Sequence, residues 1–424
     1  MKNETNAYLL TRREVLAGSV CLAGALAAGC KPKGRIKKPE TGMVYRPLGK
    51  TGLEVSEIGF GAEWMVRHTA EECAALARAC EQRGINIIDC WMGDPEVRDK
   101  VGYALRGHRD EWIIQGHVGA TWQNGKFKID RDVAACRVAF EDLLKRLDVD
   151  YVDLGMIFLV DSKDEFAKIA AGPVADYMRE LKACGKIRHI GMSTHNPEVA
   201  LAAAKSGLVE MMLFSVNPAY DILPPMEDHH RLFNDETFDS DLGGIAPIRA
   251  QVYRECAARN IGLTVMKTYA GGRLLDAARS PFKVALTPVQ CIHYALTRPA
   301  VASVLIGYDT PAHVEAAAAY CRSTAKERDY ATVLAKAPRH AYGGQCTYCA
   351  HCAPCKVGID IATVNKLYDL AVSQPTVPDS VRKHYHALKH HAKECTACGR
   401  CEKRCPFHVK VHERMKLAAA LFGE

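Results

Sequence analysis

The sequence predicts an α/β protein: a (β/α)8 barrel followed by a small, mainly helical, cysteine-rich domain. Two observations support this prediction. Eight short apolar segments alternate with helix-like segments between residues 55 and 308, and eight of the 18 cysteines fall within residues 346–405. Apolar strands that alternate with helices indicate a parallel sheet buried on both faces. Eight such units within roughly 300 residues fit a closed barrel.

The predicted strands follow one another at regular intervals. Segments such as AEECAALARACEQRG, with apolar residues three to four positions apart, separate them and predict amphipathic helices. An open, doubly wound sheet is the second choice, but it would normally carry a glycine-rich fingerprint after its first strand, and VSEIGFG has none. The strand segments are VSEIGFG, INIID, WIIQGHVG, VDLGMIFLV, RHIGMST, MMLFSVN, GLTVMKT and ASVLIGY.

Length and composition fit a barrel with an added domain. The chain has 424 residues, and its 48% apolar and 25% charged content is that of an ordinary globular protein. The net charge of +7 does not by itself indicate nucleic-acid binding. We predict a targeting segment with its linker over residues 1–40, the barrel over 41–336 and the cysteine-rich domain over 337–424. The cysteines scattered through the barrel, among them Cys73, Cys80, Cys136 and Cys256, are expected to be buried packing residues.

The N-terminal segment TRREVLAGSVCLAGALAAGC has the features of a signal peptide. Arg12 and Arg13 precede a short apolar run that ends in small residues, which is typical of the twin-arginine export route. This predicts a periplasmic or exported protein. The apolar run is short for a membrane span of roughly 20 residues, but a retained membrane anchor is the alternative. Gly29-Cys30 also resembles a lipoprotein cleavage point, so a lipid anchor at Cys30 stays open.

The carboxyl ends of the barrel strands are where the chemistry of this fold is expected. A long loop, DILPPMEDHHRLFNDETFDSDLGG, follows the sixth strand and is either a lid or a solvated insertion. Its His229 and His230 are metal-ligand types, but no further ligands are patterned around them. The residues predicted to stand at this rim are Asp89, His117, Phe158, Ser193, Asn217, Lys267 and Gly307.

Two cysteine runs near the C-terminus are the strongest signal in the sequence. The second run has the C-x2-C-x2-C-x3-C-P spacing of [4Fe–4S] ferredoxins, in which the fourth thiolate ligates the other cluster. The first run ends with an x2 spacing and has a proline before its last cysteine. Zinc sites and disulfides are the alternatives. We predict two [4Fe–4S] clusters, one held by Cys346, Cys349, Cys352 and Cys405, the other by Cys395, Cys398, Cys401 and Cys355.

Basic residues surround these cysteines in RKHYHALKHHAK and GRCEKRCPFHVKVHERMK. A cubane with four thiolates is anionic, so nearby lysines and histidines would stabilise it. The same positive charge would attract an acidic redox partner protein.

Several motifs occur in a specific order: RPLGKTGLEVSEIGFG, GINIID, YVDLGMIF and GKIRHIGMST. In these motifs the chain resembles the aldo/keto reductases. From about Val44 to the end it resembles the branch of that family with an iron-sulfur tail. The resemblance implies a (β/α)8 barrel, a nicotinamide cofactor and hydride transfer to a carbonyl. It also implies a catalytic aspartate, tyrosine, lysine and histidine after the second to fourth strands.

Only the aspartate of that catalytic set is present, as Asp89. The tyrosine, lysine and histidine positions hold Asp94, His117 and Phe158. Histidine titrates near neutral pH and can donate or accept a proton, whereas a carboxyl is a poor acid unless burial raises its pKa. We therefore expect Asp89 and His117 to form an acid/base couple, with Asp94 as a weaker catalytic candidate. The alternative is that Asp89 only satisfies backbone amides and His117 is a hydrogen-bonded core residue.

The cofactor-binding pattern of the family is also incomplete. Ser193 matches the serine that holds the nicotinamide amide, and Gly307 matches the phosphate segment. We expect Asn217 and Lys267 to complete this site. The arginine that would pair with a 2′-phosphate is replaced by His313, and phosphate monoesters are held best by arginine. NADP preference is therefore not expected, and nicotinamide binding itself stays open.

Three functions are compatible with the sequence. The first is an exported oxidoreductase that acts on a small carbonyl or sugar-like substrate, with electrons passing through the clusters. The second is an NAD-dependent aldo/keto reductase with His117 as an atypical acid/base. The third is a catalytically inactive barrel that serves as a binding or electron-transfer scaffold.

Overall fold

The computed structural model describes residues 41–238, 245–337, 342–372, 374 and 376–423. The targeting segment predicted over residues 1–40, including Cys30, lies outside the described residues. Within the described ranges, no helix has the length and apolar character needed to cross a membrane.

Eight parallel strands close into a barrel, which confirms the predicted (β/α)8 fold. Neighbouring strands follow chain order, and the pairing of the last strand with the first closes the cylinder. Strands covered on both faces need continuous apolar runs, and those with sequences IIDC and VDLGMI are buried at every position. The barrel strands are β3 (Ile58–Gly61), β4 (Ile87–Cys90), β5 (Ile113–Val118), β8 (Val152–Ile157), β9 (Ile187–Thr194), β10 (Met211–Ser215), β11 (Gly262–Met266) and β12 (Val301–Gly307).

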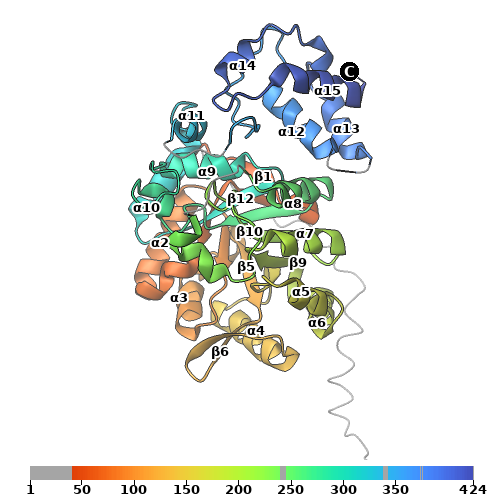
Figure 1. Ribbon diagram of the computed structural model, residues 1–424. Coiled ribbons are helices and arrows are strands. Elements are labelled where there is room, and N and C mark those ends of the chain that lie inside the picture. Colours follow the sequence, from red (N-terminus) through yellow and green to blue (C-terminus); the bar gives the residue numbers. More distant parts are fainter. Residues whose placement is uncertain (1–40, 239–244, 338–341, 373, 375, 424) are drawn as a thin grey trace, which may run out of the picture. The chain divides into compact units, whose positions relative to one another are not determined.

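Helices surround the barrel (Figure 1). Their first residues carry ordinary start signals: Thr69 and Glu72 form a capping box at the first of them, and proline occupies the first turn of several others. The barrel helices are α2 (Ala70–Gln82), α3 (Pro95–Leu105), α4 (Val133–Leu147), α5 (Lys163–Ala170), α6 (Pro173–Ala183), α7 (Pro197–Ser206), α8 (Pro247–Ala258), α9 (Pro288–Leu296), α10 (Pro311–Ala318) and α11 (Tyr330–Ala335).

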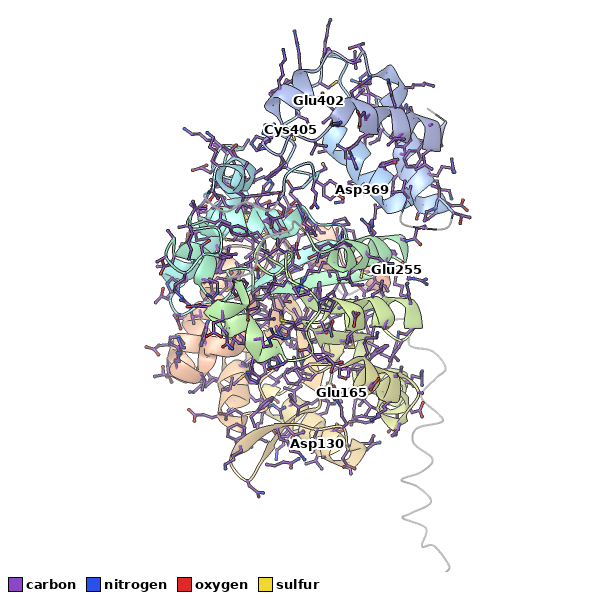
Figure 2. All side chains as sticks on the ribbon, in the orientation of Figure 1. Asp130, Glu165, Glu255, Asp369, Glu402 and Cys405 are labelled. Atoms are coloured by element: carbon purple, nitrogen blue, oxygen red, sulfur yellow. The ribbon has the colours of Figure 1, made fainter. Side chains whose placement is uncertain are left out.

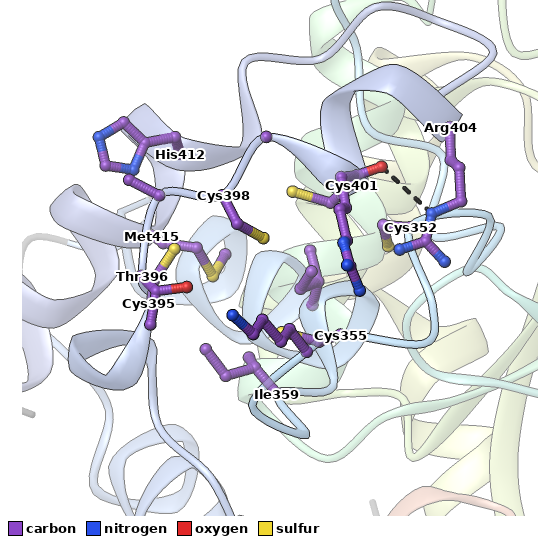
Figure 3. A pocket seen from close by; sticks show the side chains of 15 residues that line it. Cys352, Cys355, Ile359, Cys395, Thr396, Cys398, Cys401, Arg404, His412 and Met415 are labelled. Carbon is purple, nitrogen blue, oxygen red and sulfur yellow. Dashed lines mark hydrogen bonds between the residues drawn. The ribbon is translucent and has the colours of Figure 1, made fainter.

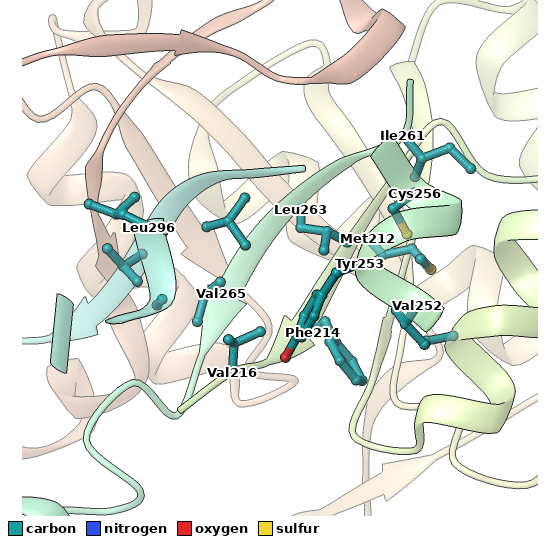
Figure 4. Packing of buried hydrophobic residues seen from close by; sticks show 14 of the residues in the cluster. Met212, Phe214, Val216, Val252, Tyr253, Cys256, Ile261, Leu263, Val265 and Leu296 are labelled. Atoms are coloured by element: carbon teal, nitrogen blue, oxygen red, sulfur yellow. The ribbon is translucent and has the colours of Figure 1, made fainter. Parts of the chain in front are cut away.

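The barrel has two hydrophobic cores, one inside the sheet and one between the sheet and the helices. Successive side chains of a strand point to opposite faces, so Met211 and Leu213 belong to the interior core while Met212 and Phe214 belong to the outer one. The hairpin of β1 (Tyr45–Pro47) and β2 (Glu54–Ser56) contributes to the interior core through Val55. Figure 4 shows the outer core between β10, β11 and α8, with Met212, Phe214, Leu263, Val265, Val252, Tyr253 and Cys256.

Most of the scattered cysteines are buried packing residues, as predicted, but Cys184 is exposed. Cys73, Cys80, Cys136 and Cys256 are each at most 1% exposed. Burial raises the pKa of the Cys73 and Cys136 thiols to about 11. Because the thiolate is the reactive form, this shift disfavours reaction of these two thiols at neutral pH.

Two insertions follow strand ends. The hairpin of β6 (Ala120–Gln123) and β7 (Lys126–Ile129) follows β5. The long loop after β10 contains two short 3-10 helices, η4 (His229–Phe233) and η5 (Asp235–Phe238). Leu232 and Phe238 of this loop are buried, so its first part is packed against the protein rather than fully solvated. Residues 239–244 of the loop lie outside the described residues.

The C-terminal region is mainly helical, as predicted. Its helices are α12 (Ile361–Val372), α13 (Asp379–His386), α14 (Arg400–Arg404) and α15 (Val411–Phe422), with the short η8 (Ala392–Glu394) between α13 and α14. Figure 2 labels Asp369 on α12 and Cys405, which follows α14. The Tyr330 hydroxyl of α11 donates to the Thr347 carbonyl at 2.9 Å, and the Tyr342 hydroxyl donates to the Pro218 carbonyl at 2.7 Å. These bonds tie the cysteine-rich region to the barrel.

Candidate active site and cysteine-lined hollows

Asp89 and His117 form a direct contact at the carboxyl ends of β4 and β5. Asp89 Oδ1 lies 2.8 Å from His117 Nε2, and the two side chains are only 6% and 1% exposed. Register explains the contact, because β4 and β5 are hydrogen-bonded neighbours in which Asp89 pairs with Gln115, two residues before His117. The structure therefore brings together the two residues predicted as an acid/base couple.

Two further polar side chains extend this contact across the barrel interior. Gln115 Nε2 donates to Asp89 Oδ1 at 2.8 Å, and the Thr264 hydroxyl of β11 donates to Gln115 Oε1 at 2.9 Å. Buried polar groups need hydrogen-bond partners. Within this network, His117 Nδ1 is buried without a hydrogen bond in the described part of the protein. Asp89 thus holds Nε2, and Nδ1 is the ring nitrogen of His117 without a protein partner.

Aromatic rings form the wall beside His117. Phe158 meets the imidazole edge to face, with ring centroids 5.3 Å apart, and stacks on Trp91 at 5.5 Å with only 5° between the ring planes. Phe127 of the β6–β7 hairpin packs edge-on against both Trp91 and Phe158. Phe127 is 39% exposed and Phe158 is 7% exposed, so this wall runs from the buried histidine to the surface. Such surfaces suit flat or sugar-like ligands.

Asp94 caps a helix rather than joining the contact between Asp89 and His117. It is the N-cap of α3, and its Oδ1 accepts a hydrogen bond from the Glu96 amide at 2.9 Å. Asp at an N-cap followed by proline is a standard helix start. In the described residues Asp94 makes no hydrogen bond to Asp89 or His117, so its geometry supports capping rather than proton transfer.

Ser193 and Asn217 are occupied by backbone groups. Ser193 Oγ accepts from the Leu159 amide at 2.8 Å. Asn217 Nδ2 donates to the Lys267 carbonyl, and its Oδ1 accepts from the Tyr220 amide, both at 2.8 Å. These bonds hold the ends of β9, β10 and β11 in place. Their predicted role in cofactor binding stays a prediction.

Lys267 and Gly307 make different contacts. Lys267 has a left-handed backbone with φ of 61°, and its Nζ lies 3.9 Å from Glu63 Oε2 and 5.3 Å from the Phe233 ring centre. Gly307 lies directly under Trp64, because a Cβ added there would be 2.5 Å from the indole. The backbone of Gly307 thus contacts a tryptophan in this structure.

The eight C-terminal cysteines line two hollows. Cys346, Cys349, Cys352 and Cys405 line one of them. Cys355, Cys395, Cys398 and Cys401 line the other, with Cys352 at its edge (Figure 3). The first hollow thus collects three cysteines of the first run and the last cysteine of the second, while the other collects three cysteines of the second run together with Cys355 and Cys352, which lines both hollows. This is the crossed grouping that the ferredoxin spacing predicts.

The backbone between the cysteines is shaped to turn their sulfurs inward. Tyr348 and Ala350, on either side of Cys349, have left-handed φ values of 59° and 63°. Ala397 and Gly399 flank Cys398 in the same way, at 53° and 69°. Non-glycine residues rarely adopt this conformation, and those that do concentrate at ligand sites. The tight loops therefore fit the binding of a compact polythiolate centre.

Side chains around the hollows connect the two cysteine loops and place positive charge beside the cysteines. Arg404 donates to the carbonyls of Ala353 and Pro354 at 2.8 and 2.9 Å, and so joins the two cysteine runs. His351 lies beside Cys349 and 2.9 Å from Asp329. The Cys349 thiol, followed by Asp329, raises the pKa of His351 to about 9. Positive charge beside thiolate ligands favours their ionised form.

The sequence of the barrel identifies the family. Residues 57–337 match the aldo/keto reductase family. This chain belongs to that family. Residues 345–410 match a 4Fe-4S dicluster domain. The chain therefore combines an aldo/keto reductase barrel with a C-terminal 4Fe-4S dicluster domain.

Relatives agree with this assignment over part of their length. Aldo-keto reductase YhdN of Bacillus subtilis (strain 168) is 30% identical over 211 residues, which are 47% of this chain and 57% of that protein. L-galactose dehydrogenase of Arabidopsis thaliana is 29% identical over 164 residues, 36% of this chain and 49% of that protein. The chain thus matches about half the length of these relatives. The solved structure of aldo-keto reductase AKR11C1 from Bacillus halodurans has a TM-score of 0.53 at 22% identity, covering 68% of this chain and 94% of that one, and shows the fold alone.

Several residues predicted to hold a nicotinamide dinucleotide are engaged by other parts of the protein. Both amide groups of Asn217 are used by the protein, and Trp64 covers Gly307. His313, at the position of the phosphate-binding arginine, accepts the Asp309 amide on Nδ1 at 3.3 Å. Ser193 Oγ acts as an acceptor for the Leu159 amide, so its hydroxyl hydrogen can still be donated to the carboxamide of a nicotinamide.

Gln115 and Thr264 are parts of the active-site network that sequence analysis missed. Gln115 stands two residues before His117 on the same strand, so the two share a face, and this spacing was the available signal. Thr264 comes from β11, on the opposite side of the barrel, and nothing local in the sequence connects it with Asp89.

Proposed function

We propose that this protein is an exported iron-sulfur oxidoreductase that interconverts a small carbonyl or sugar-like compound and its alcohol. The observation that carries the proposal is the gathering of the eight cysteines around two neighbouring hollows, with Cys405 joining the first run and Cys355 joining the second. Two [4Fe–4S] clusters fit these eight cysteines. When bound, such clusters supply one-electron transfer. Reduction of a carbonyl to an alcohol takes two electrons and two protons, which matches a pair of one-electron centres.

Within this proposal, Asp89 and His117 handle the proton at the substrate oxygen. Asp89 Oδ1 accepts the Nε2 hydrogen of His117 and orients the ring, while Nδ1, which is buried in this structure, is the ring nitrogen left without a protein partner. A buried carboxylate that orients an imidazole and stabilises its charged form is a recurrent catalytic arrangement. Trp91, Phe127 and Phe158 would pack against the apolar face of the substrate and exclude water.

Electrons would be exchanged with an acidic redox partner protein at the second hollow. Cys398 is exposed there, and the rim of this hollow is basic. Charge complementarity steers the association of redox proteins. The basic residues lining the hollow are Lys356, Arg400, Arg404 and His412.

Export by the twin-arginine route, with a periplasmic location and with or without a lipid anchor at Cys30, is part of the same proposal. Its support is the pair Arg12 and Arg13 before an apolar run. This route carries folded proteins, which suits a chain that acquires its clusters before export.

Iron analysis tests the cofactor assignment. After anaerobic reconstitution we expect about eight iron and eight sulfide per chain, as for two [4Fe–4S] clusters. Cys398→Ser should lose about half of the iron, whereas Cys184→Ser, an exposed cysteine outside both hollows, should lose none. Full iron content in Cys398→Ser, or zinc in place of iron in the wild type, would overturn the assignment.

Anaerobic titration tests the electron source. NADH or NADPH is added to the loaded protein, and the visible absorbance of the clusters is followed. We expect no bleaching by either nucleotide and full bleaching by dithionite. Bleaching by NADH would show that nicotinamide binds and feeds the clusters, and would replace this proposal by a nicotinamide-dependent reductase.

A further inference from the structure

Three side chains from separate segments converge at the carboxyl ends of neighbouring strands. Asp161 follows β8, His195 follows β9, and His229 begins η4 in the loop after β10. The strands β8, β9 and β10 are consecutive neighbours in the barrel, so their ends meet. One donor atom of each of the three residues lies within 4.8 Å of the donor atoms of the other two.

The spacing of the donor atoms is that of ligands to one small cation. Asp161 Oδ2 lies 3.1 Å from His195 Nδ1 and 3.5 Å from His229 Nδ1. Zinc binds nitrogen and oxygen donors at about 2.0–2.2 Å, which in tetrahedral geometry requires donors roughly 3.3–3.6 Å apart. The two distances from Asp161 are close to this spacing, and the donor atoms of the two histidines lie within 4.8 Å of each other.

The carboxylate is pre-oriented for this task. Asp161 Oδ1 accepts from the Thr194 hydroxyl at 2.9 Å and from the His195 amide at 2.6 Å. These bonds fix the group and direct Oδ2 toward the two imidazoles. Supporting groups that hold a ligating carboxylate in this way are typical of metal sites.

Burial also distinguishes the cluster from a surface group of histidines. The side chains of Asp161 and His195 are 6% and 7% exposed, and His229 is 22% exposed. His195 Nε2 is buried without a hydrogen-bond partner in the described ranges. The cluster is thus mostly buried, and His229, on the loop, is its most exposed member.

We propose that Asp161, His195 and His229 bind one divalent cation of the zinc class, separate from the iron-sulfur clusters. Two imidazoles and one carboxylate match the ligand preference of zinc and its neighbours, whereas calcium and magnesium prefer oxygen donors alone. Three protein ligands leave a further position for water or a substrate oxygen. Because His229 is the ligand contributed by the loop, cation binding also fastens that loop to the ends of β8 and β9.

Zinc binding to the cluster-loaded protein tests this site. Wild type and variants are brought to equal iron content, washed with chelator, and equilibrated with Zn²⁺ by dialysis before elemental analysis. We expect one zinc per chain in the wild type. His229→Gln should weaken binding at least about tenfold, because loss of even a supporting contact costs 10–100-fold. His230→Gln, the exposed neighbour in the same loop, is the matched control and should bind like the wild type.

Asp161→Asn adds a second test, since it keeps the shape of the side chain but removes its charge. Asp161 also supports the β9 end, so iron content and circular dichroism must equal those of the wild type before its zinc is counted. Should that variant misfold, His229→Gln decides alone, because His229 lies in the loop outside the barrel strands. Equal zinc affinity in wild type and His229→Gln, or no saturable zinc in the wild type, would overturn the proposal.

Discussion

The contact between Asp89 and His117 is directly testable by Asp89→Asn. This substitution keeps the shape of the side chain and removes its charge. In the wild type, Asp89 Oδ1 receives both Gln115 Nε2 and His117 Nε2 at 2.8 Å, and the carboxylate side chain is only 6% exposed. Solvent therefore cannot replace the lost interaction, and the whole network from Thr264 to His117 is affected.

The expected cost follows from the kind of hydrogen bond that is changed. A hydrogen bond to a charged group contributes about 1.5–3 kcal/mol, against about 1 kcal/mol for a neutral one. Two such bonds become neutral in Asp89→Asn, so we expect the free energy of unfolding to fall by roughly 1–4 kcal/mol. If His117 is the catalytic acid/base, turnover should fall by about 10²–10⁴-fold, the usual contribution of such a group.

The measurement is isothermal unfolding of cluster-loaded protein in denaturant under anaerobic conditions, followed by tryptophan fluorescence. Asp94→Asn is the matched control, because Asn caps helices about as well as Asp, and it should change stability by less than about 0.5 kcal/mol. A double-mutant cycle with His117→Gln isolates the pair, and we expect a coupling energy of about 1–2 kcal/mol.

Additive effects of the two substitutions within about 0.5 kcal/mol would refute direct coupling between Asp89 and His117. An unchanged turnover in a destabilised Asp89→Asn protein would leave the contact standing but assign it to the fold rather than to catalysis.

Three further predictions concern other parts of the chain. Gly307→Ala should destabilise the protein by about 1–3 kcal/mol, because the new methyl group overlaps Trp64. Gly343→Ala, which places its methyl group in open space, should leave stability unchanged. Equal melting temperatures of the two variants would contradict this prediction. Burial, followed by nearby arginines, lowers the pKa of His293 to about 4 from 6.5. Between these two pH values the unfolded chain binds more protons than the folded protein. The stabilisation from neutral His293 is therefore complete above pH 6.5, and the free energy of unfolding falls by up to about 3 kcal/mol toward pH 4. Unfolding curves measured across this pH range should show a smaller pH dependence in His293→Gln. Arg404→Ala removes the hydrogen bonds to the first cysteine loop, and we expect faster loss of cluster absorbance in air than in the wild type; an equal rate would argue against this bracing.

Much of the fold follows from local patterns in the sequence. All eight predicted strand segments overlap barrel strands to within one residue at the ends the segments miss, because a strand buried on both faces must be continuously apolar. The cysteine spacing predicted which thiols gather, and the hollow that combines Cys405 with the first run has this grouping. In both cases the residues that carry the signal are close in the chain, so the pattern is visible in one dimension.

The side-chain constellations depended on closure of the barrel. Asp89 and His117 are 28 residues apart in the sequence, and Thr264, which joins their network through Gln115, lies 149 residues after Gln115. His229 showed no partner in its own segment, and Asp161 and His195 reach it only because β8, β9 and β10 end side by side. Strand register and loop packing bring such groups together, and both are set by long-range contacts. The sequence by itself therefore determined the barrel and the cysteine loops, while the tertiary structure decided which polar side chains meet.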